Sequence, residues 1–317
     1  MHYCKTEGKT IKCTFEGKLI TLSGGLYTAD VDGRDVFCRA RGVFRHEDIK
    51  PTVGDNVVIT MGENEGDDAS IDKILERKNC LIRPPMANLD ILFCVIAAAH
   101  PEPSTLLADK LITISEHNHI EPVPIISKSD LDFARADELC SCYKKCGFDS
   151  FVFSNENGEG IDELREYIKD KCRGKTSAVA GVSGAGKSSL LNSLFPTLRQ
   201  ETGGLSEKIM RGKNTTRQTK LFRLSDLGAA ESGYFADTPG FSMIDFERFD
   251  FYTFDDLPYV FREFDEYIGH CRYTKCSHTK EEGCAILEAI EKGDIPRSRH
   301  DSYLELYAEL KKKKSYR

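Results

Sequence analysis

The segment GVSGAGKS, residues 181–188, has glycines, a lysine and a serine at the spacing G-x-x-x-x-G-K-[ST]. Glycines at this spacing let backbone N–H groups curl around phosphate oxygens, and the dipole of the following helix adds to the attraction. In such a loop we expect Lys187 to neutralise the β- and γ-phosphates and the Ser188 hydroxyl to ligate Mg²⁺. A strand-like run before the segment and a helix-like run after it favour this interpretation over a glycine-rich turn with a stray lysine. The residues expected to contact nucleotide phosphates are Ser183, Gly184, Ala185, Gly186, Lys187, Ser188 and Ser189.

A second motif, DTPG at residues 237–240, closes an apolar stretch about fifty residues after the lysine. A DxxG sequence at the end of a strand places its aspartate near Mg²⁺ and its glycine N–H near the γ-phosphate. Taken alone it is an ordinary turn, but after a phosphate loop it indicates a sensor of the third phosphate. Between the two motifs lies GKNTTR, residues 212–217, where one threonine is placed to complete the Mg²⁺ shell. We assign Asp237 and Gly240 to the sensor and Thr216 to the Mg²⁺ shell.

The stretch IISKSDL, residues 125–131, resembles the NKxD loop with which GTPases read guanine, but Ser127 replaces the asparagine. It also precedes the phosphate loop, whereas an ordinary GTPase has it downstream. Ligand loops leave a parallel sheet at the C-terminal ends of its strands, so their place in space does not depend on their order in the chain. We expect Asp130 to accept two hydrogen bonds from guanine, a contact that adenine cannot make, and the Lys128 stem to pack along the base. Ser154 and Asn155, after the next strand-like run, are expected to form the second guanine loop.

Three cysteines and one histidine lie close together near the end of the chain, at the spacing C-x4-C-x-H-x5-C. Four soft ligands at this density suit a tetrahedral Zn²⁺ site that is closed to water and therefore structural. Buried thiols beside a surface histidine are the alternative. A denser group, Cys140, Cys142 and Cys146, lacks a nearby fourth ligand, and we interpret it as ordinary thiols. The expected zinc ligands are Cys271, Cys276, His278 and Cys284.

Three kinds of structure are needed to position these residues. Up to about residue 75, short alternating runs and turns such as Asp32-Gly33 suggest a small barrel, with an OB-fold as the leading candidate. Taken alone, this pattern favours a generic β domain without a ligand. RPPMANLD, residues 83–90, has the composition of a linker. Beyond it, alternating strands and helices predict a doubly wound sheet. Together with the family resemblance given below, these patterns predict an OB-fold β-barrel at 1–78, a circularly permuted α/β P-loop GTPase domain at 79–246, and a mainly helical zinc domain at 247–317.

The composition is that of an ordinary globular protein, with 40% hydrophobic and 30% charged residues. We find no signal peptide pattern and no apolar run long enough to span a bilayer, so we expect a cytoplasmic protein whose cysteines are thiols or metal ligands. The net charge of −7 excludes a chain that is basic throughout, but not local contacts with nucleic acid. Basic stretches occur at residues 34–45, 207–223 and 311–317, and a solvated chain end explains the last one equally well.

In this order, the motifs resemble the ribosome small-subunit-dependent GTPase A family, which consists of circularly permuted GTPases. The guanine loop ahead of the phosphate loop, DTPG and the cysteine–histidine spacing carry the resemblance, which extends over nearly the whole chain. It implies hydrolysis of GTP to GDP, stimulated by the small ribosomal subunit, and a role in late maturation of that particle. It also implies Mg²⁺ and Zn²⁺ as cofactors. We expect a monomer whose barrel and residues 207–223 touch rRNA.

The chain departs from the family pattern at three positions. Ser127 makes only part of the bonds of the usual asparagine, so we expect weaker guanine affinity without loss of specificity. Asn214 stands where the family often has histidine, and Phe241 follows DTPG where many GTPases carry a water-orienting glutamine. Another group, or the ribosome, would then position the attacking water. Two alternatives stay open: a non-catalytic rRNA-binding scaffold stabilised by nucleotide, and an ATPase, which Ser127 would permit.

Overall fold

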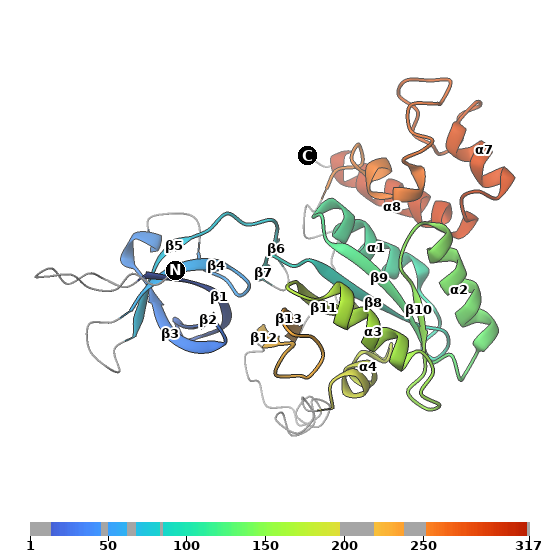
Figure 1. Cartoon of the computed structure of the whole chain (residues 1–317). Helices are drawn as coiled ribbons and strands as arrows, with labels where there is room; N and C mark the ends of the chain where they lie inside the picture. The colour runs from blue at the N-terminus through green and yellow to red at the C-terminus, as the bar shows by residue number, and fades with distance from the viewer. Residues whose placement is uncertain are drawn as a thin grey trace, which may run out of the picture. The chain divides into compact units, whose positions relative to one another are not determined.

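The computed structural model describes residues 14–45, 50–61, 68–82, 85–196, 219–237 and 252–315. The chain forms two compact units. The first contains residues 1–90, 172–178 and 212–240, and the second contains residues 91–171, 179–211 and 241–317. Figure 1 colours the chain from the blue N-terminal strands to the red C-terminal helices. Among the described residues, none of the helices has the length and apolar character needed to cross a membrane.

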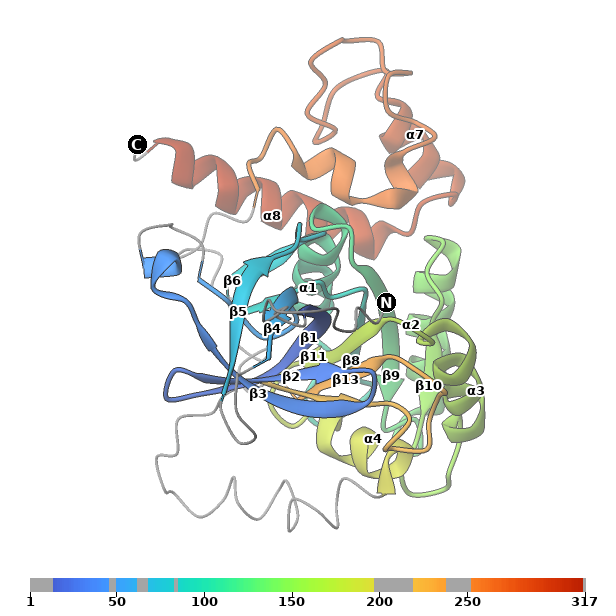
Figure 2. The same ribbon diagram turned by 60° about the vertical axis from the view of Figure 1, so that its left-hand side comes forward.

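The N-terminal segment forms a closed barrel with the strand order β1-β2-β3-β5-β4. Its strands are β1 (Thr14–Ser23), β2 (Leu26–Val31), β3 (Arg34–Ala40), β4 (Asn56–Thr60) and β5 (Ala69–Ile74). Strand β1 pairs with both β2 and β4, which closes the barrel around fully buried side chains such as Leu19 and Ile59. Asp32 and Gly33, both at positive φ, make the tight turn from β2 to β3 (Figure 2). The predicted OB-fold barrel is confirmed.

A short hairpin of β6 (Cys80–Ile82) and β7 (Pro85–Ala87) follows the barrel. The sequence suggested a linker at residues 83–90. The part of it that the structure describes is largely buried, but the first stretch of the first compact unit does end directly after it, at Asp90. Met86 and Leu89 are completely buried, and Asn79 holds Leu89 through its backbone N–H (3.0 Å) and carbonyl (2.8 Å). The Ala87 N–H donates to the carbonyl of Val53, and the Asn88 amide donates to that of Gly54. Local composition did not reveal these partners, because they lie more than thirty residues earlier in the chain.

The central sheet has the strand order β10-β9-β8-β11-β13-β12. Its strands are β8 (Ile91–Ala97), β9 (Glu121–Ser127), β10 (Phe151–Phe153), β11 (Thr176–Gly181), β12 (Lys220–Arg223) and β13 (Tyr234–Asp237). Strands β8, β9 and β10 pair in parallel, β11 pairs in parallel with β13, and β12 runs antiparallel to β13. Strand β8 is buried along its whole length, which is typical of a parallel strand covered on both faces. The loops after β9 and β10 therefore precede the loop after β11 in the chain, as the permuted order predicts.

Helices alternate with these strands, as the sequence predicted. They are α1 (Thr105–His117), α2 (Phe133–Lys145), α3 (Ile161–Lys171) and α4 (Lys187–Leu194). Ser104 caps α1 by accepting a hydrogen bond from the backbone N–H of Leu107, and Asp132 caps α2 through the N–H of Arg135. These caps fix where each helix begins, and so they fix the length of the loop between it and the preceding strand.

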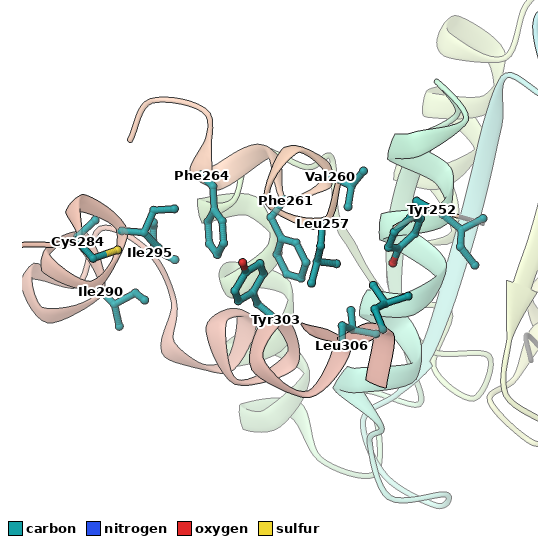
Figure 3. Close-up of a cluster of buried hydrophobic side chains, with 14 residues drawn as sticks. Tyr252, Leu257, Val260, Phe261, Phe264, Cys284, Ile290, Ile295, Tyr303 and Leu306 are labelled. Carbon is teal, nitrogen blue, oxygen red and sulfur yellow. The ribbon is translucent and has the colours of Figure 1, made fainter. Parts of the chain in front are cut away.

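The C-terminal region consists of two short 3₁₀ turns, η2 (Leu257–Val260) and η3 (Arg262–Phe264), followed by the helices α7 (Ala285–Lys292) and α8 (Arg297–Ser315). Its core is aromatic: Phe261 stacks on Phe264 with ring centroids 5.2 Å apart, and Tyr303 meets both rings edge-on (Figure 3). The same cluster contains Ile114 of α1, and the Tyr252 hydroxyl donates to Thr113 over 2.6 Å. The mainly helical C-terminal region therefore shares its core with α1.

Candidate nucleotide site and metal cluster

The predicted phosphate loop lies where the motif requires it, between β11 and α4 (Figure 1). Gly181 must be glycine, because a Cβ there would lie 2.4 Å from the carbonyl oxygen of Val95. Gly186 begins α4 in the left-handed conformation, at φ 93°. The loop therefore turns sharply from a buried strand into a helix N-terminus, which is the geometry that aims backbone N–H groups at an anion.

Lys187 folds back over this loop. Its ammonium group donates to the carbonyl oxygens of Gly181 (2.8 Å) and Val182 (2.7 Å). Burial lowers the pKa of Lys187 from its usual value. Ser188, the next residue, is exposed. The lysine charge is thus held inside the loop, where the phosphates of a nucleotide would compete with two carbonyl oxygens for it.

Ser127 connects the guanine loop to the phosphate loop. It ends β9, is fully buried, and its hydroxyl lies 2.5 Å from the carbonyl oxygen of Ala185 and 3.2 Å from that of Ile96. One hydroxyl hydrogen serves one of these acceptors at a time, and the shorter contact is the one to the phosphate loop. A Cβ on Gly186 would lie 3.3 Å from the same hydroxyl oxygen. Ser127 therefore bonds to the phosphate loop at a place where Gly186 packs closely against its side chain.

The two predicted guanine loops meet. Strands β9 and β10 pair with Ser127 opposite Phe153, so the loops that follow them start level with each other. Asp130 is exposed, and its Oδ1 accepts a hydrogen bond of 2.5 Å from the Ser154 hydroxyl. Lys128 stands at φ 60° and its ammonium group donates to the carbonyl of His100. The structure thus brings the carboxylate expected to read guanine together with Ser154.

Asn155 points elsewhere: its Oδ1 accepts a hydrogen bond of 2.7 Å from Ser193 on α4. Thr216 and Gly240 lie outside the described residues, as does most of the basic stretch 207–223. Of Asp237 the structure describes the backbone, which ends β13 opposite Lys220.

Arg223, counted in the basic stretch 207–223, is held by Asp30 (2.8 Å) and by Asp35 of the barrel. Its charge is therefore engaged within the protein, which its sequence context did not indicate.

The four predicted zinc ligands converge. The ligand atoms of Cys271, Cys276, His278 and Cys284 all lie within 4.8 Å of one another. The Nδ1 atom of His278 is 3.5 Å from the sulfur of Cys271 and from that of Cys284, and the two sulfurs are 3.9 Å apart. A tetrahedron with Zn–S bonds of about 2.3 Å has edges of about 3.8 Å, so these separations fit zinc.

The surroundings of the cluster also suit a metal. Burial lowers the pKa of His278, which favours the neutral ring that binds metal, and burial raises the pKa of Cys276 to about 12. Thiolates at this place would therefore need a cation beside them. The Tyr303 hydroxyl and the His300 ring hold the backbone carbonyls of Ser277 and His278, each over 2.8 Å. These bonds fix the turn that carries the histidine ligand, in the manner of an outer shell.

Two residues of the guanine loops escaped the sequence analysis. Ser129 is buried and its hydroxyl donates to Glu159 over 2.5 Å. Nothing in the sequence separates Glu159 from Glu156 in the same loop, because the contact depends on how the two loops fold against each other.

Comparisons with known proteins agree with this geometry. The family model for the RsgA GTPase matches residues 74–247, and that for the RsgA N-terminal domain matches residues 16–68. The small ribosomal subunit biogenesis GTPase RsgA of Caldanaerobacter subterraneus is 40% identical over 304 residues, 95% of this chain and 98% of that relative. Its counterpart in Geobacillus thermodenitrificans is 41% identical, over 94% of this chain and 98% of that relative.

Two solved structures are also similar. YjeQ from Thermotoga maritima has a TM-score of 0.76 and 32% identity, over 94% of this chain and 98% of its own. YloQ, described as a circularly permuted GTPase, has a TM-score of 0.76 and 30% identity, over 98% of each chain. The family model covers more than half of the chain, and the relatives cover nearly all of it. The chain therefore belongs to the RsgA GTPase family and is a GTP hydrolase.

Proposed function

We propose that the chain binds the small ribosomal subunit and acts in its late maturation, hydrolysing GTP to GDP and phosphate when that particle stimulates it. The observation that carries the GTP part is the bond from Ser127 to Ala185. It places the loop expected to read guanine against the loop expected to hold phosphates. The partner follows from the names of the relatives, which are small ribosomal subunit biogenesis GTPases.

The proposed division of labour follows the two loops. Lys187 and the backbone N–H groups of residues 183–189 hold the phosphates, in competition with the carbonyls that the lysine now contacts. Asp130 reads guanine, Lys128 packs on the base, and Ser154 orients the carboxylate. Ser188 and Thr216 are the proposed Mg²⁺ ligands, with Asp237 acting through water and Gly240 sensing the γ-phosphate. Bound Mg²⁺ would neutralise charge that develops on the phosphates.

The remaining parts of the proposal concern metal, RNA and assembly. The Cys₃His cluster is proposed to hold structural Zn²⁺, since four protein ligands leave no position for water. The barrel is proposed to touch rRNA, and Phe37 on β3 is 57% exposed, as a ring that stacks on a base must be. The domain bounds 1–78, 79–246 and 247–317, a monomeric state and a cytoplasmic location also belong to this proposal.

Steady-state phosphate release tests the proposal directly. GTP and ATP are each supplied with no ribosomal particles, with small subunits and with large subunits. We expect strong stimulation confined to GTP and to the small subunit, and its loss in the Lys187→Ala variant. Slow GTP turnover that ignores the small subunit would show that the partner is wrong, and no turnover of either nucleotide would favour the scaffold. Equal use of ATP would overturn the guanine assignment.

A further inference from the structure

Ser129 and Glu159 fasten the two guanine loops to each other. Ser129 lies between Lys128 and Asp130 and is 1% exposed. Its hydroxyl donates to the Oε2 atom of Glu159 over 2.5 Å, and its backbone N–H points at the carbonyl of Phe153 over 3.4 Å. A hydroxyl that donates to a carboxylate makes a charge-assisted bond, which is stronger than a neutral one. The middle residue of the first loop is thus bound to a side chain of the second.

The same two loops are joined at a second point, and the bonds form a closed ring. The Ser154 hydroxyl donates to Asp130 over 2.5 Å, and the Ser154 N–H donates to the carbonyl of Glu159 over 3.1 Å. The ring therefore runs from the Asp130 carboxylate through Ser154 to Glu159, and from the Glu159 carboxylate back through Ser129 to Asp130. Ser154 thus holds the Asp130 carboxylate through its Oδ1 atom, and Ser129 holds the backbone directly before it, which limits how the carboxylate can turn.

The backbone of β9, β10 and Gly160 brings the two loops close enough for this ring of bonds to form. Parallel pairing puts Ile125 opposite Phe151 and Ser127 opposite Phe153, so both loops leave the sheet side by side (Figures 1 and 2). Gly160 then brings the second loop back against β10, because a Cβ there would lie 1.9 Å from the carbonyl oxygen of Val152. Glu159, one residue before this close approach, is directed at Ser129.

We propose that Glu159, through Ser129, is a positioning residue that determines guanine specificity. Its carboxylate locks the two loops together and holds the Asp130 carboxylate in the orientation that accepts both the ring N–H and the exocyclic amine of guanine. The proposal rests on the proposed role of Asp130. It assigns to Glu159 and Ser129 part of the ordering of the loops that the usual asparagine of the NKxD motif supplies, at the position that Ser127 occupies in this chain.

Calorimetric titration of the full chain with three nucleotides tests the proposal. GDP offers both hydrogen bonds, inosine diphosphate lacks the exocyclic amine, and ADP lacks the guanine pattern altogether. We expect Glu159→Ala to weaken GDP binding at least about tenfold, the effect of losing one charge-assisted hydrogen bond. Inosine diphosphate should lose less affinity than GDP, and ADP should lose none, so the preference for GDP over inosine diphosphate falls.

Three variants complete the design. Ser129→Ala should reproduce the effect, and the double variant should be no worse than either single one, because both remove the same bond. Glu156→Ala, at an exposed residue of the same loop, should bind all three nucleotides as the unchanged chain does. Equal weakening of all three nucleotides by Glu159→Ala would mean that the loop is merely loosened and would overturn the proposal, as would unchanged GDP affinity.

Asp130→Asn separates this proposal from the one on which it rests. If Asp130→Asn abolishes the preference for GDP while Glu159→Ala preserves it, Asp130 reads guanine and the positioning role of Glu159 is wrong. If Asp130→Asn also preserves the preference, the guanine assignment itself fails and the role of Glu159 falls with it. Stimulation by ribosomal subunits enters neither measurement.

Discussion

The replacement of asparagine by serine at residue 127 changes how the nucleotide site is held. The Ser127 hydroxyl reaches the carbonyl of Ala185 in the phosphate loop, in a place without solvent access. Asp130, which is expected to contact the base, is held separately by Ser154. The tether and the base reader are thus different side chains with different partners. Removing the Ser127 hydroxyl should weaken binding of the nucleotide's phosphates, and removing the Asp130 carboxylate should change which base is preferred.

We predict that Ser127→Ala weakens GDP and inosine diphosphate binding by the same factor. The loss should be about tenfold, because the carbonyl of Ala185 loses a buried hydrogen bond worth about 1 to 2 kcal/mol and the phosphate loop loses its tether. Calorimetric titration measures both nucleotides. Ser150→Ala is the matched control, since Ser150 is also buried and donates to the carbonyl of Pro124 over 3.1 Å, at the other end of β10. A changed ratio between the nucleotides in Ser127→Ala would contradict the separation of roles.

Among the elements, β12 and β13 are joined to the barrel by a buried ion pair. Asp30 of β2 is 7% exposed and accepts hydrogen bonds from Arg223 (2.8 Å) and from the Tyr234 hydroxyl (2.7 Å). Burial alone would raise the pKa of Asp30, but the bonds from Arg223 and Tyr234 outweigh it and hold that pKa below its usual value. These strands follow the predicted Thr216 loop, and β13 ends at Asp237, the first residue of DTPG. The pair therefore anchors the segment between the predicted Mg²⁺ ligand Thr216 and the predicted γ-phosphate sensor.

We predict that Asp30→Asn lowers the free energy of unfolding by about 3 kcal/mol near pH 7, since it leaves Arg223 without its buried partner. The pKa of Asp30 is lower in the folded chain than in the unfolded one, so its contribution is complete above about pH 4 and disappears as the pH falls through the folded value. Urea denaturation from pH 7 to pH 3 should show the gap between the two proteins closing in acid. Asp35→Asn, at an exposed partner of the same arginine, should cost no more than about 1 kcal/mol. If the difference in the free energy of unfolding between the two proteins were the same at every pH, the stabilising role of the Asp30 charge would be wrong.

The elements that could be predicted from the sequence are those whose signal is local. The phosphate loop, the first guanine loop and the zinc spacing each lie within one short segment. The structure puts the first two directly after β11 and β9 and brings the four cysteine and histidine ligand atoms together, whereas Asn155 of the second guanine loop bonds to Ser193 on α4. The misreadings have a common physical cause. In the expected linker, Ala87 and Asn88 bond to Val53 and Gly54, and in the expected basic patch Arg223 is paired with Asp30, so both segments depend on residues far away in the chain. Glu159 is of the same kind, because its partner Ser129 belongs to another loop.

On the scale of the whole molecule, the C-terminal region has two independent sources of stability. One is the aromatic core around Phe261 and Tyr303, which it shares with α1. Between α8 and α1 lies Arg299, which is 1% exposed and paired with Asp109 and with Glu263 (2.6 Å). The other source is the cysteine–histidine cluster. The bonds described within the phosphate and guanine loops involve none of the cluster residues.

Metal removal should therefore separate stability from nucleotide binding. We predict one zinc ion per chain, and we expect its removal by a chelator to lower the melting temperature, because zinc adds its binding free energy to the folded state. Affinity for GDP should stay within about twofold, since a change of less than 0.5 kcal/mol is typical of sites that share no partners. Helix content should fall little at room temperature, because Tyr303 and Leu306 remain packed on α1 through the core (Figure 3). Cys276→Ser should lose zinc, whereas Cys142→Ser, a thiol outside the cluster, should keep it. Loss of GDP binding together with zinc would show that the cluster supports the nucleotide site as well as its own region.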